Sequence, residues 1–195
     1  MTFVSRLATA LLLAMAGAAA CAAPPSTAAP LQSLPRLAVA PYMGTWYQVL
    51  WLPNSFQKQC ASDTAASYRE LGDGTVEVVN RCRKADGEWD SVTGVARPPR
   101  GAARIEAGVL QPARLEVSFL PRWLRWTGIG WGAYWVVDLA ADGRYAIVSE
   151  ASREYLWVLS RQPALTPEDE TLIRRRLETL GFELAKVQSH PHTAR

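Results

Sequence analysis

Residues 132–161 read GAYWVVDLAADGRYAIVSEASREYLWVLSR, and they hold three short runs that favour β-structure. The runs cover residues 132–139, 144–150 and 155–160, and they are rich in Val, Ile, Tyr and Trp. Asp142 and Gly143 separate the first two runs, and an Asp-Gly pair favours the tight turn of a β-hairpin. This stretch therefore predicts three consecutive antiparallel strands.

Five further runs of the same kind precede this stretch. They cover residues 45–52, 64–71, 75–84, 88–97 and 114–120, with Asp-Gly turn signals at Asp73-Gly74 and Asp86-Gly87. In the run 114–120, Leu115, Val117 and Phe119 share one face, as expected for a strand with one dry side. Eight strands with short connections predict an all-β protein, either an antiparallel up-and-down barrel or a sandwich. An eight-stranded barrel has room inside for one small ligand.

One α-helix is predicted after the last strand. Thr166 is suited to the N-cap, Pro167 to the first helical position, and the acids at 168–170 to the first turn. An apolar stripe follows, consisting of Leu172, Ile173, Leu177 and Leu180, and Gly181 is a stop signal. We expect this amphipathic helix to pack against the outside of the barrel.

The composition is ordinary for one globular domain. The chain has 195 residues, of which 49% are hydrophobic and 20% charged, and its net charge is +3. Nucleic-acid-binding proteins concentrate far more positive charge on one face, so we expect no nucleic-acid partner. A monomer and a homodimer are both compatible with the sequence.

The N-terminus has the features of an export signal. Arg6 precedes an apolar stretch, residues 7–16, that is too short to span a bilayer. Ala18-Ala19-Ala20 and Cys21 follow and resemble the lipobox of bacterial lipoproteins, which implies removal of residues 1–20 and acylation of Cys21. Plain cleavage after Ala20 is the alternative, and it would yield a soluble periplasmic or secreted protein. Residues 21–36 are rich in Ala, Pro, Ser and Thr and are expected to form a flexible tether to the membrane.

The other two cysteines, Cys60 and Cys82, can form a disulfide in an oxidising compartment. Such a bond would stabilise the fold by roughly 3 kcal/mol through the entropy of the unfolded chain. It would leave Cys21 as an odd thiol unless acylation consumes it, which favours the lipoprotein interpretation.

Motifs for catalysis are lacking. The sequence holds no G-x-S-x-G turn, no zinc-ligand spacing and no glycine-rich phosphate loop. The two histidines, His190 and His192, fall in the tail 189–195, which is predicted to be disordered and could bind a metal only weakly. We therefore expect no enzymatic activity, no cofactor and no metal site.

Three separated motifs occur in order along the chain: Tyr42-Met43-Gly44-Thr45-Trp46-Tyr47, then residues 134–139 with 145–148, and then residues 152–161 with Pro163 following. Together they resemble the motifs of the lipocalins, and among these the bacterial outer-membrane lipocalins. The likeness covers residues 36–188, and the lipocalin domain is predicted over 37–188. The resemblance implies that Gly44, Trp46 and Arg161 are structural, with Arg161 stacked on Trp46 at the closed end of the barrel. Residues 100–112 look longer than in relatives and could form an extra hairpin or touch a partner.

The resemblance also implies a fatty acid or a lysophospholipid as ligand, bound inside the barrel at the outer membrane. Side chains on the expected inward faces would line the cavity, namely Tyr68, Val78, Leu115, Val117, Phe119, Tyr134, Val136 and Trp157. In the connection 120–131, Trp123 and Trp126 stand beside Arg122 and Arg125, a mixture suited to a rim that meets anionic lipid. The alternative is that these tryptophans fold into the core.

Two other functions stay open at this point. The barrel could be filled by its own side chains and act as an envelope scaffold without a ligand. One class of lipocalin-fold enzymes uses a cysteine thiol facing the cavity, and a free thiol at Cys60 or Cys82 would favour that class.

Overall fold

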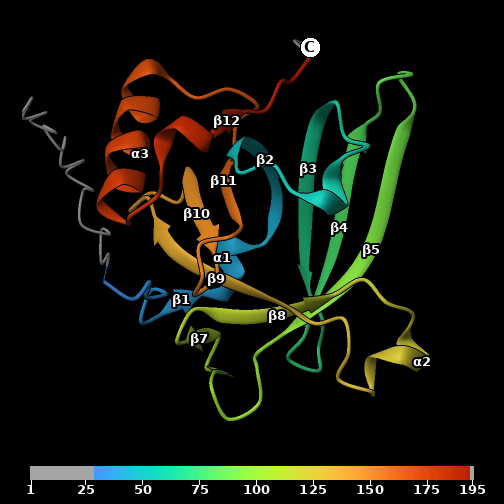
Figure 1. Ribbon diagram of the computed structural model, residues 1–195. Coiled ribbons are helices and arrows are strands. Elements are labelled where there is room, and N and C mark those ends of the chain that lie inside the picture. Colours follow the sequence, from blue (N-terminus) through green and yellow to red (C-terminus); the bar gives the residue numbers. More distant parts are fainter. Residues whose placement is uncertain (1–28, 194–195) are drawn as a thin grey trace, which may run out of the picture.

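A computed structural model of the chain describes residues 29–193, and its main body is a closed β-barrel (Figure 1). Eight antiparallel strands follow one another around the barrel, and pairing of the last strand with the first closes it. They are β2 (Gly44–Trp51), β3 (Ser62–Glu70), β4 (Val76–Arg83), β5 (Trp89–Arg97), β8 (Arg114–Ser118), β9 (Gly132–Leu139), β10 (Tyr145–Ser149) and β11 (Leu156–Ser160). The predicted eight-stranded antiparallel barrel is confirmed, and the sandwich alternative is wrong.

The period-two pattern of the sequence explains these strands. In β4, Val76, Val78 and Cys82 are buried, while their neighbours along the strand are more exposed. Turn residues set the ends of the strands: Gly143, between β9 and β10, has a φ of 74°, a conformation that glycine adopts without strain. Pattern and turn chemistry thus agree on the same register.

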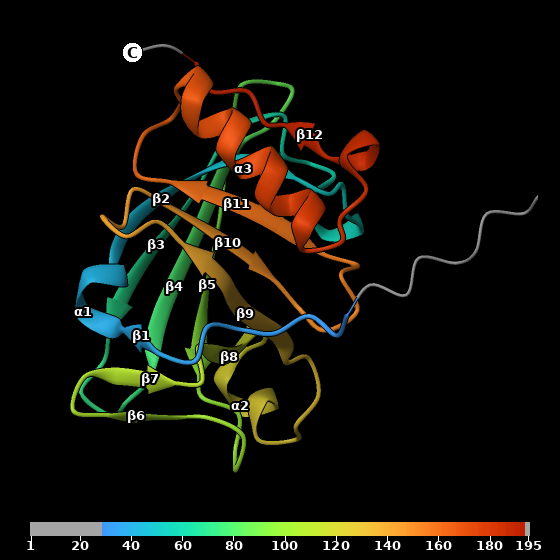
Figure 2. The same cartoon turned by 90° about the vertical axis from the view of Figure 1, so that its left-hand side faces the viewer.

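The segment between β5 and β8 forms an extra hairpin, one of the two outcomes expected for residues 100–112. It consists of β6 (Arg104–Glu106) and β7 (Val109–Gln111), and β1 (Leu37–Ala38) pairs with β7 to complete a three-stranded sheet. In Figure 2 the hairpin of β6 and β7 lies at the bottom, and the helical turn α1 (Val39–Tyr42) lies at the left edge of the barrel. They cover the end at which β2 begins.

Helix α3 (Pro167–Thr179) lies across the outside of the barrel, as predicted (Figure 2). The Thr166 side chain caps it by accepting a hydrogen bond from the Asp169 N–H at 3.1 Å. Ile173 and Leu177 are fully buried, in one cluster with residues of β10 and β11. Ile173, Leu177 and the partly buried Leu180 of the predicted stripe therefore form the face that docks the helix. The assignment of Leu172 to this stripe is wrong, because its side chain is 48% exposed.

At the closed end, the Arg161 guanidinium stacks on the indole of Trp46, with its Cζ 3.6 Å from the ring centroid. Trp46 is fully buried, and its Nε1–H donates to the Tyr42 carbonyl at 2.8 Å. Arg161 donates through Nη1 to the Thr45 carbonyl at 2.9 Å and through Nη2 to the Pro41 carbonyl at 2.7 Å. One side chain thus covers the indole and ties two backbone segments together.

Cys60 and Cys82 form the predicted disulfide. It ties the loop between β2 and β3, which contains the turn η1 (Ser55–Gln57), to the end of β4. Because both cysteines are consumed, neither supplies the free thiol that the enzyme alternative requires.

The predicted flexible tether is shorter than expected. Leu31 is 4% exposed and packs in the cluster beneath α3, and the Leu34 N–H donates to the Val136 carbonyl at 2.8 Å. The interpretation of residues 31–36 as flexible is therefore wrong, because their two leucines bury apolar surface against the barrel. The predicted signal sequence and Cys21 lie outside the described residues.

The prediction of a disordered tail from residue 189 is also wrong for the described part of the tail. After the turn η2 (Leu184–Lys186), strand β12 (Gln188–Ser189) pairs with the upper half of β2, whereas β2 pairs with β3 only over residues 44–47. His190, Pro191 and Thr193 then hydrogen-bond to Asp63 or Thr64 of β3. The tail fills a split between β2 and β3 that would otherwise leave backbone groups unpaired.

Replacing Arg161 by lysine tests the closed end. A lysine keeps the charge but loses the planar stacking and one of the two carbonyl contacts, so R161K is expected to lower the free energy of unfolding by about 2 kcal/mol. Urea denaturation measures this change. The control is R174K, which makes the same change at an arginine on the surface of α3. If both substitutions have an equal, small effect on the free energy of unfolding, Arg161 does not stabilise the closed end of the barrel.

Protonation of His190 is expected to weaken the tail. Burial, together with the nearby His192, lowers the pKa of His190 to about 4, and its Nε2 accepts the Thr64 N–H at 3.4 Å. In the unfolded chain the histidine has its ordinary pKa of about 6.5. The contribution of neutral His190 to the stability of the fold is therefore complete above that pH and is lost as the pH falls toward 4. We expect a loss of roughly 2 kcal/mol between about pH 7.5 and pH 4.5 that H190Q largely abolishes, measured by urea denaturation. Equal pH slopes in both proteins would contradict this assignment.

Candidate functional site

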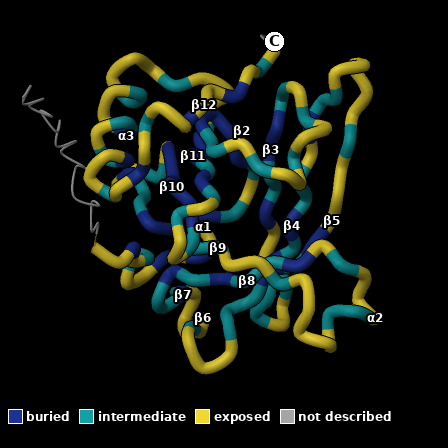
Figure 3. The backbone as a smooth tube through the Cα atoms, viewed as in Figure 1, coloured by how far each residue is buried: buried dark blue, intermediate teal, exposed yellow. Residues whose placement is uncertain are grey.

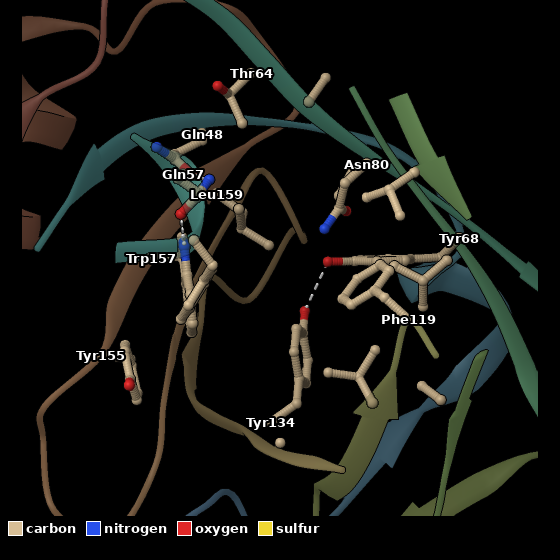
Figure 4. Close-up of a pocket in the computed structure, with 18 of the residues that line it drawn as sticks. Gln48, Gln57, Thr64, Tyr68, Asn80, Phe119, Tyr134, Tyr155, Trp157 and Leu159 are labelled. Atoms are coloured by element: carbon tan, nitrogen blue, oxygen red, sulfur yellow. Dashed lines mark hydrogen bonds between the residues drawn. The ribbon is translucent and has the colours of Figure 1, made fainter. Parts of the chain in front are cut away.

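The barrel encloses a cavity of about 770 Å³, a size usual for small-molecule sites. Its wall is formed by the inward faces of the strands. At the end away from Trp46, residues of the connections 52–61 and 150–155 join the wall, among them Phe56, Gln57 and Tyr155. Figure 4 shows the side chains of the wall converging on this space.

Seven of the eight predicted lining residues border this cavity. They are Tyr68, Val78, Leu115, Val117, Phe119, Tyr134 and Trp157. The interpretation of Val136 as a lining residue is wrong, because Val136 is 1% exposed and lies in the core cluster that also contains Trp46. It shares the inward parity of Tyr134 but sits in the part of the barrel that side chains fill.

Three tyrosine hydroxyl groups form the polar inner end of the cavity. Tyr134 Oη lies 2.7 Å from Tyr42 Oη and 3.0 Å from Tyr68 Oη. The rings of Tyr42 and Tyr68 stack, with centroids 5.8 Å apart. Burial raises the pKa of Tyr68 to about 12 and the pKa values of Tyr42 and Tyr134 well above their ordinary range. All three hydroxyl groups therefore keep their protons at neutral pH.

A second polar chain runs along the wall near the loop 52–61. The indole N–H of Trp157 donates to Gln57 Oε1 at 2.8 Å, and Gln57 Nε2 donates to Gln48 Oε1 at 2.9 Å. Because an indole nitrogen can only donate, these contacts fix the orientation of both amides. These hydrogen bonds hold η1 against the barrel and keep one side of the cavity in place (Figure 4).

Sequence reasoning missed the polar lining residues Gln48, Gln57, Thr64 and Asn80. For Asn80 a signal was present, since it continues the inward series of Val76 and Val78 in β4. A polar residue at an inward position of an apolar strand indicates a binding or bonding role.

The charged lining residues come from the turn 150–155 and from the adjacent ends of β4 and β5. They are Arg81, Asp90, Glu150 and Glu154. Burial raises the pKa of Glu150, but hydrogen bonds from Ser152 and from the amides of Tyr155 and Glu154 outweigh burial and bring it below its ordinary value. The charged lining residues therefore gather at the loop end of the cavity and leave the tyrosine end neutral.

The connection 119–131, with the short helix α2 (Arg122–Arg125), projects from the barrel (Figures 1 and 3), and its residues Phe119 and Gly130 line the cavity. Trp123 is 70% exposed and Trp126 83%, so the alternative that they fold into the core is wrong. Arg122 is exposed, whereas Arg125 donates to the Leu120 carbonyl at 2.7 Å and orders the loop. Trp131 is partly buried beneath the Arg97 guanidinium, 3.8 Å from its ring centroid.

Within residues 29–193, no helix is long and apolar enough to cross a bilayer. The same part of the chain contains no group of three or more His, Cys, Asp or Glu side chains placed to hold a metal ion.

Comparison with known proteins agrees with the barrel and its cavity. The lipocalin-like domain family matches residues 37–192. Temperature-induced lipocalin-1 of Arabidopsis thaliana is 32% identical over 161 residues, which is 80% of each chain. The outer membrane lipoprotein Blc of Citrobacter freundii is 31% identical over 147 residues, covering 75% of this chain and 74% of Blc.

A solved structure shares the fold at much lower sequence identity. Apocrustacyanin C1 superposes with a TM-score of 0.59 at 12% identity, covering 79% of each chain. The family match, the two sequence relatives and the closed barrel all agree, and we conclude that this chain belongs to the lipocalin family.

Proposed function

We propose that this chain binds a single-chain lipid, either a fatty acid or a lysophospholipid, in the barrel cavity and stores or transports it at the cell envelope. Members of the lipocalin family bind small hydrophobic ligands. The observation that carries the proposal is the cavity of about 770 Å³, with Val78, Leu115, Val117 and Phe119 among its apolar lining residues. An acyl chain would gain about 0.8 kcal/mol for each methylene buried there.

The cavity favours ligand binding over a scaffold filled by its own side chains. Of the eight tryptophans, Trp157 lines the cavity, whereas Trp89, Trp123 and Trp126 are exposed. These three exposed tryptophan side chains therefore do not fill the interior of the barrel.

Anchoring at the outer membrane through acylated Cys21 is the second part of the proposal. Its support is the lipobox-like sequence ending at Cys21, together with the pairing of the other two cysteines. Relatives of about 30% identity are named outer membrane lipoproteins in Citrobacter freundii and Escherichia coli.

The tryptophan loop 119–131 would then contact the anionic membrane surface. Trp123, Trp126 and Ile129 expose large apolar side chains next to Arg122, and Phe119 and Gly130 of the same loop line the cavity. Apolar residues flanked by arginine suit an interface with anionic headgroups. Contact there would bring the cavity close to the lipid it takes up.

A large side chain placed in the cavity should weaken lipid binding. V117W places an indole in the cavity, so saturable quenching of tryptophan fluorescence by lysophospholipid or fatty acid at micromolar concentration is expected to weaken at least tenfold. The matched control is T93W, at an exposed position of the neighbouring strand β5. Equal binding by the two variants would mean that the ligand lies outside the barrel.

Removing the exposed indoles should weaken membrane contact. For residues 29–195, which lack the proposed anchor, W123A with W126A is expected to reduce binding to vesicles containing phosphatidylglycerol about tenfold or more, as measured by co-sedimentation. L172A, which removes an exposed side chain from the remote helix α3, should leave vesicle binding unchanged. If L172A and the double variant behave alike, the loop is not the membrane-contacting surface.

A further inference from the structure

Polar atoms gather at the inner end of a cavity whose wall is otherwise largely apolar. Figure 4 shows the hydroxyl groups of Tyr68 and Tyr134 and the amide nitrogen of Asn80 directed toward the same region. The three residues come from neighbouring parts of the wall: Tyr68 pairs with Val78 across β3 and β4, and Asn80 is two residues further along β4. A ligand chain that ends in a methyl group would leave these polar groups without a hydrogen-bond partner, because it can neither accept nor donate a hydrogen bond.

The hydroxyl cluster has hydrogen-bonding capacity to spare. Tyr42, Tyr134 and Tyr68 carry three hydroxyl protons, and the two hydrogen bonds between them use two. One O–H therefore remains for a further acceptor. Among the side chains drawn in Figure 4, the Asn80 amide has no hydrogen bond, so its N–H and C=O groups add donors and an acceptor.

This end of the cavity suits an uncharged oxygen better than a carboxylate. The tyrosines stay protonated because burial raises their pKa values, and the charged lining residues lie at the loop end. Arg161, the cation whose charge acts on Tyr42 and Tyr68, donates to the carbonyls of Thr45 and Pro41 and does not line the cavity. An ionised carboxylate buried without a cationic partner costs several kcal/mol.

We propose that Tyr68, Tyr134 and Asn80 form a recognition site for an uncharged oxygen, a hydroxyl or a carbonyl, at the buried end of the lipid. The proposal rests on the proposed function, since it names the chemistry of the end that enters first. The preferred ligand is an acyl-chain amphiphile oxygenated at or near the end of its chain, and its ionic head remains at the loop end of the cavity.

A matched pair of ligands isolates this contact. Palmitic acid and ω-hydroxypalmitic acid have the same carboxylate and chain and differ by one terminal hydroxyl group. The full chain, purified in detergent and freed of lipid, is offered an equal mixture, and native mass spectrometry gives the ratio of the two complexes. Because a net hydrogen bond contributes about 0.5–1.5 kcal/mol, the ω-hydroxy acid is expected to exceed palmitic acid about 2- to 13-fold. Shorter pairs, from lauric and myristic acid, find the length at which the hydroxyl reaches the site.

Two variants locate the effect. Y68F removes one hydroxyl but keeps the bond between Tyr42 and Tyr134, and N80L removes an amide without breaking a hydrogen bond drawn in Figure 4. Each variant removes one of the three proposed contacts and is expected to move the ratio toward one while palmitic acid still binds. The control Y47F makes the same chemical change in β2 at a residue that does not line the cavity, and it should keep the ratio of the wild-type chain.

The outcomes separate the two proposals. If neither acid forms a complex, the proposed function fails. If both bind and palmitic acid equals or exceeds the ω-hydroxy acid at every chain length, or if Y68F and N80L leave the preference intact, the neutral recognition site is overturned and lipid binding stands.

Discussion

The stacking of Arg161 on Trp46 is the interaction on which the rest of this barrel depends. Trp46 is a large side chain at the start of the first barrel strand, and burying it requires something to cover its ring and to satisfy the carbonyls around it. Arg161 does both, with its Cζ 3.6 Å from the ring centroid and its nitrogens bonded to Thr45 and Pro41. Since Arg161 follows β11 directly, the same contact fixes where the last strand meets the first. The cavity begins above this layer, at the tyrosine hydroxyl groups.

Closure of the wall imposes a second constraint, because a barrel wall cannot leave a long row of backbone groups unpaired. Strands β2 and β3 pair only as far as Tyr47, and residues of the loop that carries η1 line the cavity beyond that point. The C-terminal segment 188–193 hydrogen-bonds to both strands where β2 and β3 are no longer paired. The Cys60–Cys82 disulfide holds the loop between these strands to β4. The wall beside Gln48 and Thr64 is thus built from segments that are far apart in sequence.

Period-two alternation and Asp-Gly turns were enough to predict the eight strands, and capping signals were enough for α3, because both depend on local chemistry. The failures concern contacts that are not local. Val136 has the inward parity of a cavity residue, but parity does not tell how deep the core is filled. The tail around His190 looked polar and irregular, and nothing local indicates that β2 and β3 part and leave it a place to dock. Leu31 and Leu34 were the missed signal in the tether, since two leucines three residues apart give an Ala- and Pro-rich segment apolar surface that is stabilised by packing against the barrel.

We propose that the cavity carries a single-chain lipid, and mass spectrometry of the protein extracted gently from its own membranes can detect such a lipid. We expect a one-to-one complex with an acyl-chain lipid that is released on denaturation, on a chain that begins at an acylated Cys21. Recovery of the chain without any bound lipid, combined with failure of the emptied protein to take up lipid in a titration, would contradict it.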